Sequence, residues 1–363
     1  MSMNTPIKGR GAGSRLPGRF ERTVSQAEDD GWPLDDSVEF AAPRLRTRVS
    51  EETARSIISR NQSPDVGFAQ SVNPYRGCEH GCSYCFARPS HAYLNLSPGL
   101  DFETRLFAKT NAPELLRREL GKPGYVPSPI ALGINTDAYQ PIERRLRLTR
   151  RLIEVLWEAR HPFSLITKNA LVERDLDLLV PLARENLVSV YFSVTSLDRR
   201  LSARLEPRAS APHARLCAMR TLHEAGVPVG VMVAPVIPWI NDHALEAVLE
   251  AARDAGAESA GYVLLRLPHE VSPLFRDWLQ LHYPDRAAHV MSSVQQLHGG
   301  KDYDSVFGKR MCGEGIYAEL LARRFALAHK RLGYAVAPWP KLDCSRFVKP
   351  SLPCAPSPQG ELF

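Results

Sequence analysis

The sequence predicts an α/β fold built on a parallel sheet, and two features of the chain carry that prediction. Short apolar runs alternate with longer amphipathic runs about six times between residues 68 and 267, which is the pattern of repeated strand–helix units. Glycine directly follows two of the amphipathic runs, at Gly226 and Gly256, where it is a helix stop signal. Such units form right-handed crossovers and place their chemistry on the loops after the strands. Periodicity alone fits an open doubly wound sheet as well as a barrel.

The expected elements follow from the apolar and amphipathic runs in order. Strands are expected over residues 68–72, 130–134, 163–167, 188–194, 227–233 and 262–267. Helices are expected over 146–159, 175–184, 214–225 and 243–255. Beyond Leu267 the pattern becomes helical, with segments over 272–281, 287–297 and 314–332. We therefore expect a core over residues 51–270, a C-terminal helical extension over 271–337 and an irregular tail, rich in Pro and Ser, over 338–363.

The first 50 residues divide into a basic and an acidic stretch. The basic residues are Lys8, Arg10, Arg15, Arg19 and Arg22, and the acidic ones are Glu28, Asp29, Asp30, Asp35, Asp36 and Glu39. A segment of this composition buries little apolar surface, so residues 1–50 are expected to form a flexible N-terminal arm. The whole chain has a net charge of +6. DNA or RNA contact by the basic arm is one expectation, and a plain solubilising tail is the other.

Membrane and secretory classes are disfavoured by composition. The chain has 363 residues with 44% hydrophobic content, which is enough to bury a large core. No apolar run approaches the ~20 residues that cross a bilayer, and the start of the sequence lacks the apolar stretch of a signal peptide. We expect a cytoplasmic protein with no membrane partner, and the sequence leaves its oligomeric state open.

A tight triplet of cysteines is the most informative motif. Cys78, Cys82 and Cys85 have the spacing C-x3-C-x2-C, with no fourth cysteine nearby. Soft thiolates select iron–sulfur clusters, zinc or copper. A cubane cluster held by three cysteines leaves one iron free to bind a substrate or cofactor, so the spacing indicates reactivity as well as electron storage.

Two other interpretations of the triplet were weighed. His80 or His91 would complete a Cys3His zinc site, although four-ligand zinc sites usually come as two separated pairs of ligands. A disulfide framework is disfavoured, because seven cysteines is an odd count and no secretory segment is evident. We interpret the triplet as a cluster site in a reducing compartment.

The triplet, with Tyr84 before its third cysteine, resembles the signature of the radical S-adenosylmethionine (SAM) superfamily. The wider runs over residues 73–82 and 97–103 are similar to the branch related to spore photoproduct lyase, whose members are often labelled DNA repair photolyase-like. The resemblance implies a partial (β/α)6 barrel that holds a 4Fe-4S cluster and SAM. It further implies that one electron cleaves SAM reductively to a 5′-deoxyadenosyl radical, which abstracts hydrogen from a substrate.

The resemblance also assigns polar residues at the strand ends to SAM. Asn135, Thr136 and Asp137 stand where many family members carry Gly-Gly-Glu for the amino group, Lys168 faces the carboxylate, and Ser193 has a similar role. Glu206 resembles a Glu-Pro element that accepts from the ribose hydroxyls, and the run 233–237 resembles the strand that lies against adenine. Arg88, His91 and Lys109 are expected to form an anion-binding rim near the cysteines.

One departure from the branch concerns the reaction. Spore photoproduct lyase uses a cysteine near the end of its second strand to return a hydrogen atom, whereas residues 131–137 hold no cysteine. Cys312 is the candidate donor in its place. We expect a radical SAM enzyme acting on a nucleic-acid base, reduced by a partner such as a flavodoxin or ferredoxin. The alternatives are a peptide or small-metabolite substrate, and a non-catalytic zinc or iron–sulfur nucleic-acid-binding module.

Overall fold

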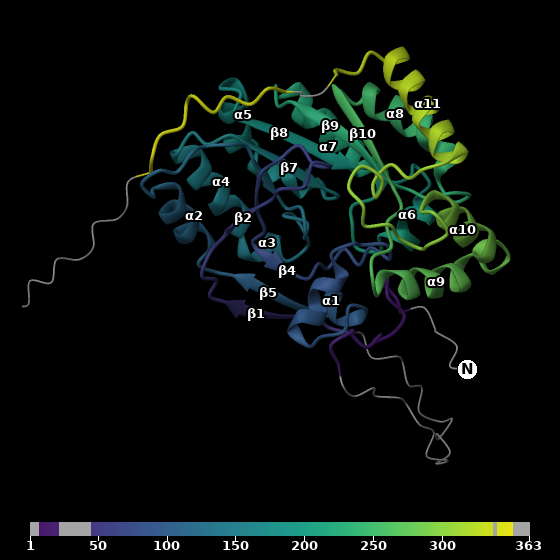
Figure 1. Cartoon of the computed structure of the whole chain (residues 1–363). Coiled ribbons are helices and arrows are strands. Elements are labelled where there is room, and N and C mark those ends of the chain that lie inside the picture. The colour runs from purple at the N-terminus through teal and green to yellow at the C-terminus, as the bar shows by residue number, and fades with distance from the viewer. Residues whose placement is uncertain (1–6, 22–44, 337–339, 351–363) are drawn as a thin grey trace, which may run out of the picture.

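The computed structural model describes residues 7–21, 45–336 and 340–350, and its centre is a curved seven-stranded sheet (Figure 1). The strand order is β10-β9-β8-β7-β6-β3-β2. All neighbours run parallel except β2 and β3, which are antiparallel. The strands are β2 (Ile58–Arg60), β3 (Gln70–Val72), β6 (Ile130–Leu132), β7 (Phe163–Thr167), β8 (Val188–Ser193), β9 (Val229–Val236) and β10 (Ser259–Leu264). The six parallel strands confirm the predicted partial (β/α)6 barrel.

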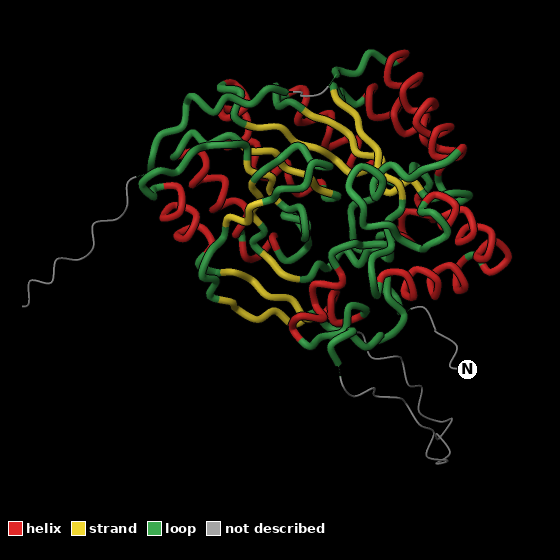
Figure 2. The backbone as a smooth tube through the Cα atoms, in the orientation of Figure 1, coloured by secondary structure: helices red, strands yellow, loops and turns green. Residues whose placement is uncertain are grey.

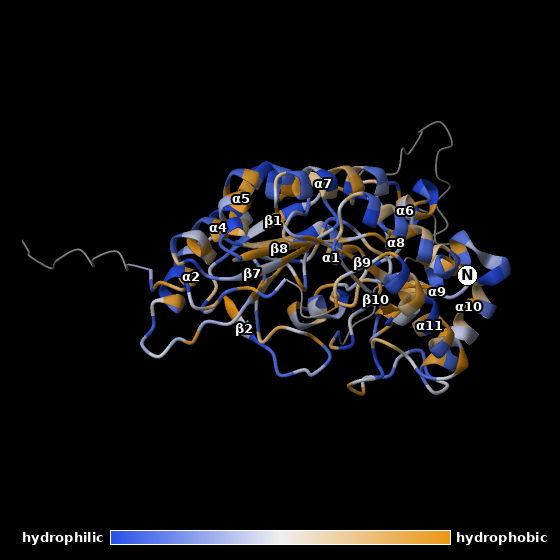
Figure 3. Cartoon of the chain, turned by 90° about the horizontal axis from the view of Figure 1, so that it is seen from above, coloured by the Kyte–Doolittle hydropathy of each residue, from blue (hydrophilic) through white to orange (hydrophobic). Residues whose placement is uncertain are grey.

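Helices cover the outer face of this sheet, as Figure 3 shows for the row α2, α4, α5 and α7. Their bounds are α2 (Ala112–Leu120), α3 (Glu143–Leu146), α4 (Leu148–Glu158), α5 (Leu176–Arg184), α6 (Arg199–Leu205), α7 (Pro212–Glu224) and α8 (Leu245–Asp254). The strands are apolar and mostly buried, with Leu132, Val190 and Val231 fully enclosed. Near-continuous apolar runs of this kind are typical of parallel strands covered on both faces.

A second, three-stranded sheet brackets the cysteine loop and was not predicted. Its order is β1-β5-β4, with β1 (Arg48–Glu52) parallel and β4 (Tyr75–Arg76) antiparallel to β5 (Arg105–Lys109). The short helices η1 (Arg88–Leu94) and α1 (Leu100–Thr104) lie between β4 and β5 in sequence. These strands are short, and β1 is largely exposed, so they lack the apolar periodicity that sequence analysis uses. Figure 2 shows the loops that lie between the two sheets.

The C-terminal extension is helical, as predicted. It consists of α9 (Val271–His282), α10 (Pro284–Leu297) and α11 (Ile316–Arg331). Residues 340–350 contain no helix or strand, whereas the rest of the predicted tail lies outside the described residues. In the described ranges, no helix is both long enough and apolar enough to cross a bilayer.

Part of the predicted flexible arm is docked on the core. Residues 7–21, which we call the N-terminal strap, pack Ala12 into an apolar cluster with Leu100 and Leu274. Arg19 forms an ion pair with Glu270 at 2.9 Å. Residues 7–21 of the predicted arm thus contact the core through distant partners that composition could not reveal. Arg22 and the acidic stretch over 28–39 lie outside the described residues.

The two outer edges of the main sheet are joined by a polar clasp. Asp65, in the loop between β2 and β3, accepts hydrogen bonds from Gly308 N at 2.6 Å and from Arg310 Nε at 2.5 Å. Met311 O, next to Arg310, accepts from Leu264 N at the end of β10 at 2.9 Å. The segment over 304–312 thus connects one edge strand to the loop of the other, across the open side of the partial barrel.

Candidate functional site

The cysteine loop begins directly after β4 and is held at both ends by backbone hydrogen bonds. Cys78 N donates to Phe102 O at 2.9 Å, and Ser83 N donates to Leu205 O at 3.0 Å. Cys78 and Cys82 are buried, Cys85 is half-buried, and all three thiols are free. Cys85 packs against both apolar clusters that contain the other two cysteines. The structure therefore brings the predicted triplet to one place, at the edge where the parallel strands end.

The triplet fits a soft metal centre by the chemistry of its donors. Burial raises the pKa of the Cys82 thiol to about 12, and the nearby charge of Lys168 opposes that rise. Burial also raises the pKa of Cys78. Such thiols become thiolates when a metal replaces their protons. Ser83 Oγ, beside Cys82, is buried and has no hydrogen-bond partner in the described part of the chain. Within the described ranges, no set of three or more His, Cys, Asp and Glu side chains is already gathered as a metal site, so the fit rests on this chemistry.

The histidines proposed as a fourth zinc ligand are engaged elsewhere. His80 Nδ1 lies 3.3 Å from Asp137 Oδ2, and its Nε2 lies 3.5 Å from Asn169 Nδ2. His91 is fully buried, and its Nε2 contacts Arg105 O at 3.0 Å. A Cys3His zinc site through His80 would require that side chain to leave Asp137 or Asn169. His91 is engaged through Nε2 alone, and its buried Nδ1 has no hydrogen-bond partner among the described residues, so the zinc alternative through His91 stays a prediction.

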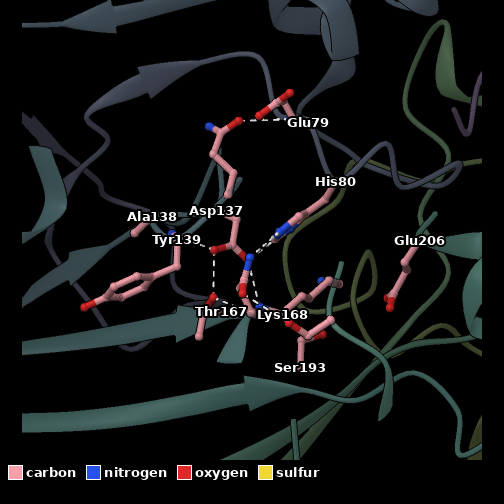
Figure 4. A network of polar contacts seen from close by, with 12 residues as sticks. Glu79, His80, Asp137, Ala138, Tyr139, Thr167, Lys168, Ser193 and Glu206 are labelled. Atoms are coloured by element: carbon pink, nitrogen blue, oxygen red, sulfur yellow. Dashed lines mark hydrogen bonds and ion pairs between the residues drawn. The ribbon is translucent and has the colours of Figure 1, made fainter. Parts of the chain in front are cut away.

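Asp137, after β6, organises the strand ends around it (Figure 4). One of its oxygens accepts from Thr167 Oγ1 at 2.7 Å and Tyr139 N at 2.8 Å. The other accepts from Lys168 N at 2.7 Å and faces His80. Burial alone would raise the pKa of Asp137, but these partners, His80 foremost, lower it to about 2. A carboxylate offers about four lone-pair sites, so a direct bond to SAM would require exchange of one of these contacts.

Lys168, after β7, places a cation beside the loop. Its Nζ lies 5.9 Å from the centre of the Tyr84 ring. Burial acts to lower the pKa of Lys168, but the neighbouring Cys82 and Glu206 outweigh burial and raise it. The amine is therefore protonated at neutral pH, and it suits the carboxylate recognition that was predicted for it.

Glu206, after α6, joins the loop to the end of β8. Tyr84 Oη and Arg215 Nη2 both donate to its carboxylate, as does Thr195 Oγ1 at 2.5 Å. Arg215 Nη1 also donates to Ser193 O at 2.8 Å. Burial would raise the pKa of Glu206, but Arg215 and Lys168 lower it. Glu206 is 2% exposed, so its carboxylate fixes the position of Tyr84 in this arrangement.

The remaining strand-end residues lie at the same edge. Asn135 is exposed, and its backbone N donates to Asn73 Oδ1 at 2.8 Å. Thr136 Oγ1 is buried and donates to Tyr75 O at 3.1 Å. Ser193 Oγ donates to Ala234 O, at 3.2 Å, on the neighbouring strand β9. Asn73 and Tyr75 precede the cysteine loop, so the backbone before the loop is tied to the residues that follow β6.

The predicted anion-binding rim is wrong, because its three side chains serve the interior. Arg88 is fully buried and forms an ion pair with Glu103 at 2.5 Å. Burial lowers the pKa of His91. Lys109 Nζ donates to Asn73 O at 3.0 Å, and burial lowers the pKa of Lys109. These side chains contact the loops around the cysteines, and Arg88 and His91 have no exposed surface.

Cys312 lies in the clasp segment and is exposed. The backbone bond from Leu264 N to its neighbour Met311 places it beside the end of β10. No described contact joins Cys312 to the triplet, and its role as a hydrogen donor stays a prediction.

Sequence reasoning missed Thr195, Arg215 and Arg266 as site residues. Thr195 directly follows the predicted strand, which was an available signal, whereas Arg215 lies within α7 and gave none. Arg266 follows β10, and its guanidinium carbon lies 5.0 Å from the centre of the Phe86 ring, directly after Cys85. Its buried Nε has no hydrogen-bond partner among the residues that the structure describes. Arg266 is therefore a further cation available to a bound anionic group.

A six-unit partial barrel with a three-cysteine loop at its strand ends defines a class of cluster-dependent enzymes. The family model described as Radical SAM superfamily matches residues 72–252. An uncharacterized protein of Mycobacterium tuberculosis is 36% identical over 265 residues, which cover 72% of this chain and 77% of that protein. An uncharacterized protein of Methanocaldococcus jannaschii is 26% identical over 225 residues, which cover 62% of this chain and 80% of that protein. The chain belongs to the radical SAM superfamily and is an enzyme of that class.

Solved structures of spore photoproduct lyase share this fold. One, complexed with dinucleoside spore photoproduct, has a TM-score of 0.55 at 16% identity and covers 79% of this chain and 80% of its own. A variant with bound AdoMet and dinucleoside spore photoproduct gives the same values. At this identity the likeness concerns the fold, which is the one that the motif resemblance implied.

Proposed function

We propose that this radical SAM enzyme holds a 4Fe-4S cluster on Cys78, Cys82 and Cys85 and abstracts hydrogen from a nucleic-acid base. When bound, the cluster would supply the electron that cleaves SAM reductively to a 5′-deoxyadenosyl radical. An external reductant such as a flavodoxin or ferredoxin would supply that electron to the enzyme, and we propose a cytoplasmic location.

The observation that carries the proposal is the cation next to the cysteine loop. Lys168 is protonated and lies beside Tyr84, whose hydroxyl is fixed by Glu206. A cation here would bind the SAM carboxylate with a charge-assisted hydrogen bond. Asn135 offers a side-chain amide to the amino group of SAM, and Ser193 offers a hydroxyl to its carboxylate. Asp137 would hold the backbone of Lys168 in place, and Glu206 would hold the hydroxyl of Tyr84. Thr136 would tie the backbone after β6 to Tyr75.

The choice of a nucleic-acid base rests on two supports. The fold is similar to that of spore photoproduct lyase complexed with dinucleoside spore photoproduct, and the net charge of +6 favours a polyanion. A peptide or small-metabolite substrate is the alternative. Two observations favour this alternative. Part of the positive charge is neutralised by ion pairs within the protein, such as Arg310–Asp65 and Arg88–Glu103. The clasp also crosses the open side of the barrel, where a large substrate would enter.

The test is anaerobic reconstitution with iron and sulfide, followed by dithionite, SAM and an assay for 5′-deoxyadenosine. The wild-type chain is expected to bind about four irons and to release 5′-deoxyadenosine. Cys82→Ala is expected to lose that product. Cys217→Ala is the matched control, because Cys217 is an exposed, free cysteine outside the loop. Zinc in place of iron, with no SAM cleavage, would establish the non-catalytic alternative.

The substrate is tested by adding damaged DNA, RNA or peptides and following hydrogen exchange from solvent into the product. A stimulation of SAM cleavage by oligonucleotides alone supports the base as substrate. Stimulation by peptides alone overturns it. Cys312→Ser, assayed for altered product in the same reaction, tests whether this thiol donates the returning hydrogen.

A further inference from the structure

The N-terminal strap reaches the cysteine loop through one buried carboxylate. Glu103, at the end of α1, is fully buried. Its two oxygens accept from the strap backbone, from Gly11 N at 3.0 Å and Ala12 N at 2.9 Å. Arg88 Nη2 also donates to Glu103, at 2.5 Å. The strap is therefore tied to the interior by a charged group that has no access to water.

Arg88 carries this connection onward to a cluster cysteine. Its Nε donates to Cys82 O at 2.9 Å, while its Nη1 donates to Pro98 O at 3.1 Å and Gly99 O at 2.9 Å. Glu103 and Arg88 thus form a continuous chain of contacts from the strap backbone to the carbonyl of Cys82. Such a buried network holds its geometry only while every member is paired.

The strap also contacts the cysteine loop directly, where Gly11 of the strap packs against Gly81 of the loop. A Cβ on Gly11 would lie 1.7 Å from Gly81 O, between Cys78 and Cys82. Gly81 has a φ of +67°, and a Cβ there would lie 2.7 Å from Glu103 Oε2. Only residues without side chains allow the two backbones to approach this closely.

A second anchor runs through the neighbouring Arg10. Its guanidinium donates to Glu103 O at 2.9 Å and to Thr47 Oγ1 at 3.1 Å. Thr47 Oγ1 in turn donates to Glu79 Oε1 at 2.7 Å, inside the cysteine loop. Strap contacts therefore reach Glu79, Gly81 and Cys82, three of the five residues from Cys78 to Cys82.

We infer that the strap is a positioning element for the cluster-binding loop, with Gly11 and Glu103 as its positioning residues. The inference rests on the proposed function, because it concerns the loop that would hold the cluster. The strap covers the loop and fixes the backbone that carries two of the three thiols. Displacing it should therefore loosen the cluster while the barrel stays folded, since the main sheet is packed without the strap.

The test compares two substitutions in the same strap, Gly11→Ala and Gly18→Ala. A Cβ at position 18 meets Ala92 Cβ at 3.0 Å, on η1, and does not meet the cysteine loop. Both full-length variants are reconstituted anaerobically. Iron per chain, the rate of cluster loss to a chelator, the midpoint potential and the Tm of the apoprotein are measured. All cluster measurements are made well below the lowest Tm.

Gly11→Ala is expected to lose its cluster at least tenfold faster than the wild type and to shift its midpoint potential. Gly18→Ala is expected to keep both values. Arg10→Met is the second variant, because it removes an anchor without adding a Cβ at the close approach, and its cluster loss should also accelerate. Changes in the rate of cluster loss and in midpoint potential, measured where all apoproteins are folded, show that the strap positions the loop. A strap that only stabilised the fold would leave both values unchanged at that temperature.

Wild-type rates and potentials in both Gly11→Ala and Arg10→Met would overturn the inference. Equal acceleration in Gly11→Ala and Gly18→Ala, in proportion to their loss of apoprotein Tm, would also overturn it. A wild-type chain that binds no iron after reconstitution would overturn the proposed function itself. The two failures are therefore distinguishable in one experiment.

Discussion

His80, inside the cysteine loop, lies with its Nδ1 3.3 Å from Oδ2 of Asp137 at the end of β6. His80 is 1% exposed, so this contact is shielded from solvent. Asp137 also accepts hydrogen bonds from the end of β7, through Thr167 Oγ1 and Lys168 N. One carboxylate therefore joins the loop between the first two cysteines to two neighbouring strands of the barrel.

We predict that Asp137→Asn loosens this junction. The amide nitrogen would face hydrogen-bond donors in place of an acceptor, and an unsatisfied buried group costs about 1–3 kcal/mol. Urea unfolding of the apoprotein should show that loss, and the reconstituted variant should hold less iron. Asp177→Asn is the control, because Asp177 is an exposed partner of Arg150 and such pairs contribute about 0–1 kcal/mol. Equal stability of Asp137→Asn and the wild type would contradict the prediction.

Lys168→Met is predicted to weaken SAM binding without unfolding the chain. Hydrogen bonds to charged groups contribute about 1.5–3 kcal/mol, so the Kd for SAM should rise about 10- to 100-fold. Anaerobic equilibrium dialysis of the reconstituted protein measures it. Lys122→Met, an exposed change beyond α2, should leave the Kd unchanged. An unaltered Kd in Lys168→Met would remove Lys168 from the proposed SAM site.

The buried pair Arg215–Glu206 predicts a non-additive effect on stability. Both side chains are at most 1% exposed, and removing one partner of a buried pair costs about 3–5 kcal/mol because the other charge is left unpaired. Arg215→Met alone should therefore lower the free energy of unfolding more than the double change with Glu206→Gln. Urea unfolding of Arg215→Met, Glu206→Gln and the double variant gives the coupling free energy between the two side chains. A double variant whose loss of stability equals the sum of the two single losses would show that the two charges do not depend on each other.

Stability is predicted to fall as the pH drops from 6.5 toward 4. Burial lowers the pKa of His161 to about 4. Between pH 6.5 and pH 4, His161 is therefore protonated in the unfolded chain but neutral in the folded chain, and protonation favours unfolding. The loss attributable to His161 is up to about 3 kcal/mol. Asp137 affects stability in a lower pH range. Its pKa is lowered in the folded chain, so the stability that it contributes is lost only as the pH falls from about 4 toward 2.

His161→Gln isolates the first of these effects. The stability of this variant should depend less on pH between 6.5 and 4 than that of the wild type, as measured by urea unfolding at several pH values. His243→Gln, a change at an exposed histidine, should retain the wild-type slope. The same slope in His161→Gln and the wild type would assign the pH dependence to other groups.

The sequence by itself determined the strands of the main sheet and the position of the cysteine motif. Hydrophobic periodicity located the strand over 163–167, which the structure gives as Phe163–Thr167, and placed each of the other five parallel strands within a few residues. Periodicity suffices for such elements because a buried strand or an amphipathic helix records its surroundings in its own residues. The cysteine spacing likewise specified the cluster motif, since a metal-binding loop needs its ligands close together in the chain.

Only the tertiary structure decided which polar groups meet. Arg10 reaches Glu103 from 93 residues away, and Tyr84 reaches Glu206 from 122 residues away. From the sequence alone, Arg88 was assigned to an anion-binding rim and residues 7–21 to a flexible arm, because charge alone does not show whether a distant partner is present. A buried charged side chain must be paired. Its partner comes next to it only when the chain has folded, so the sequence does not show which residue that partner is. The motif thus fixed where the chemistry lies, whereas long-range packing decided how the cysteine loop is held.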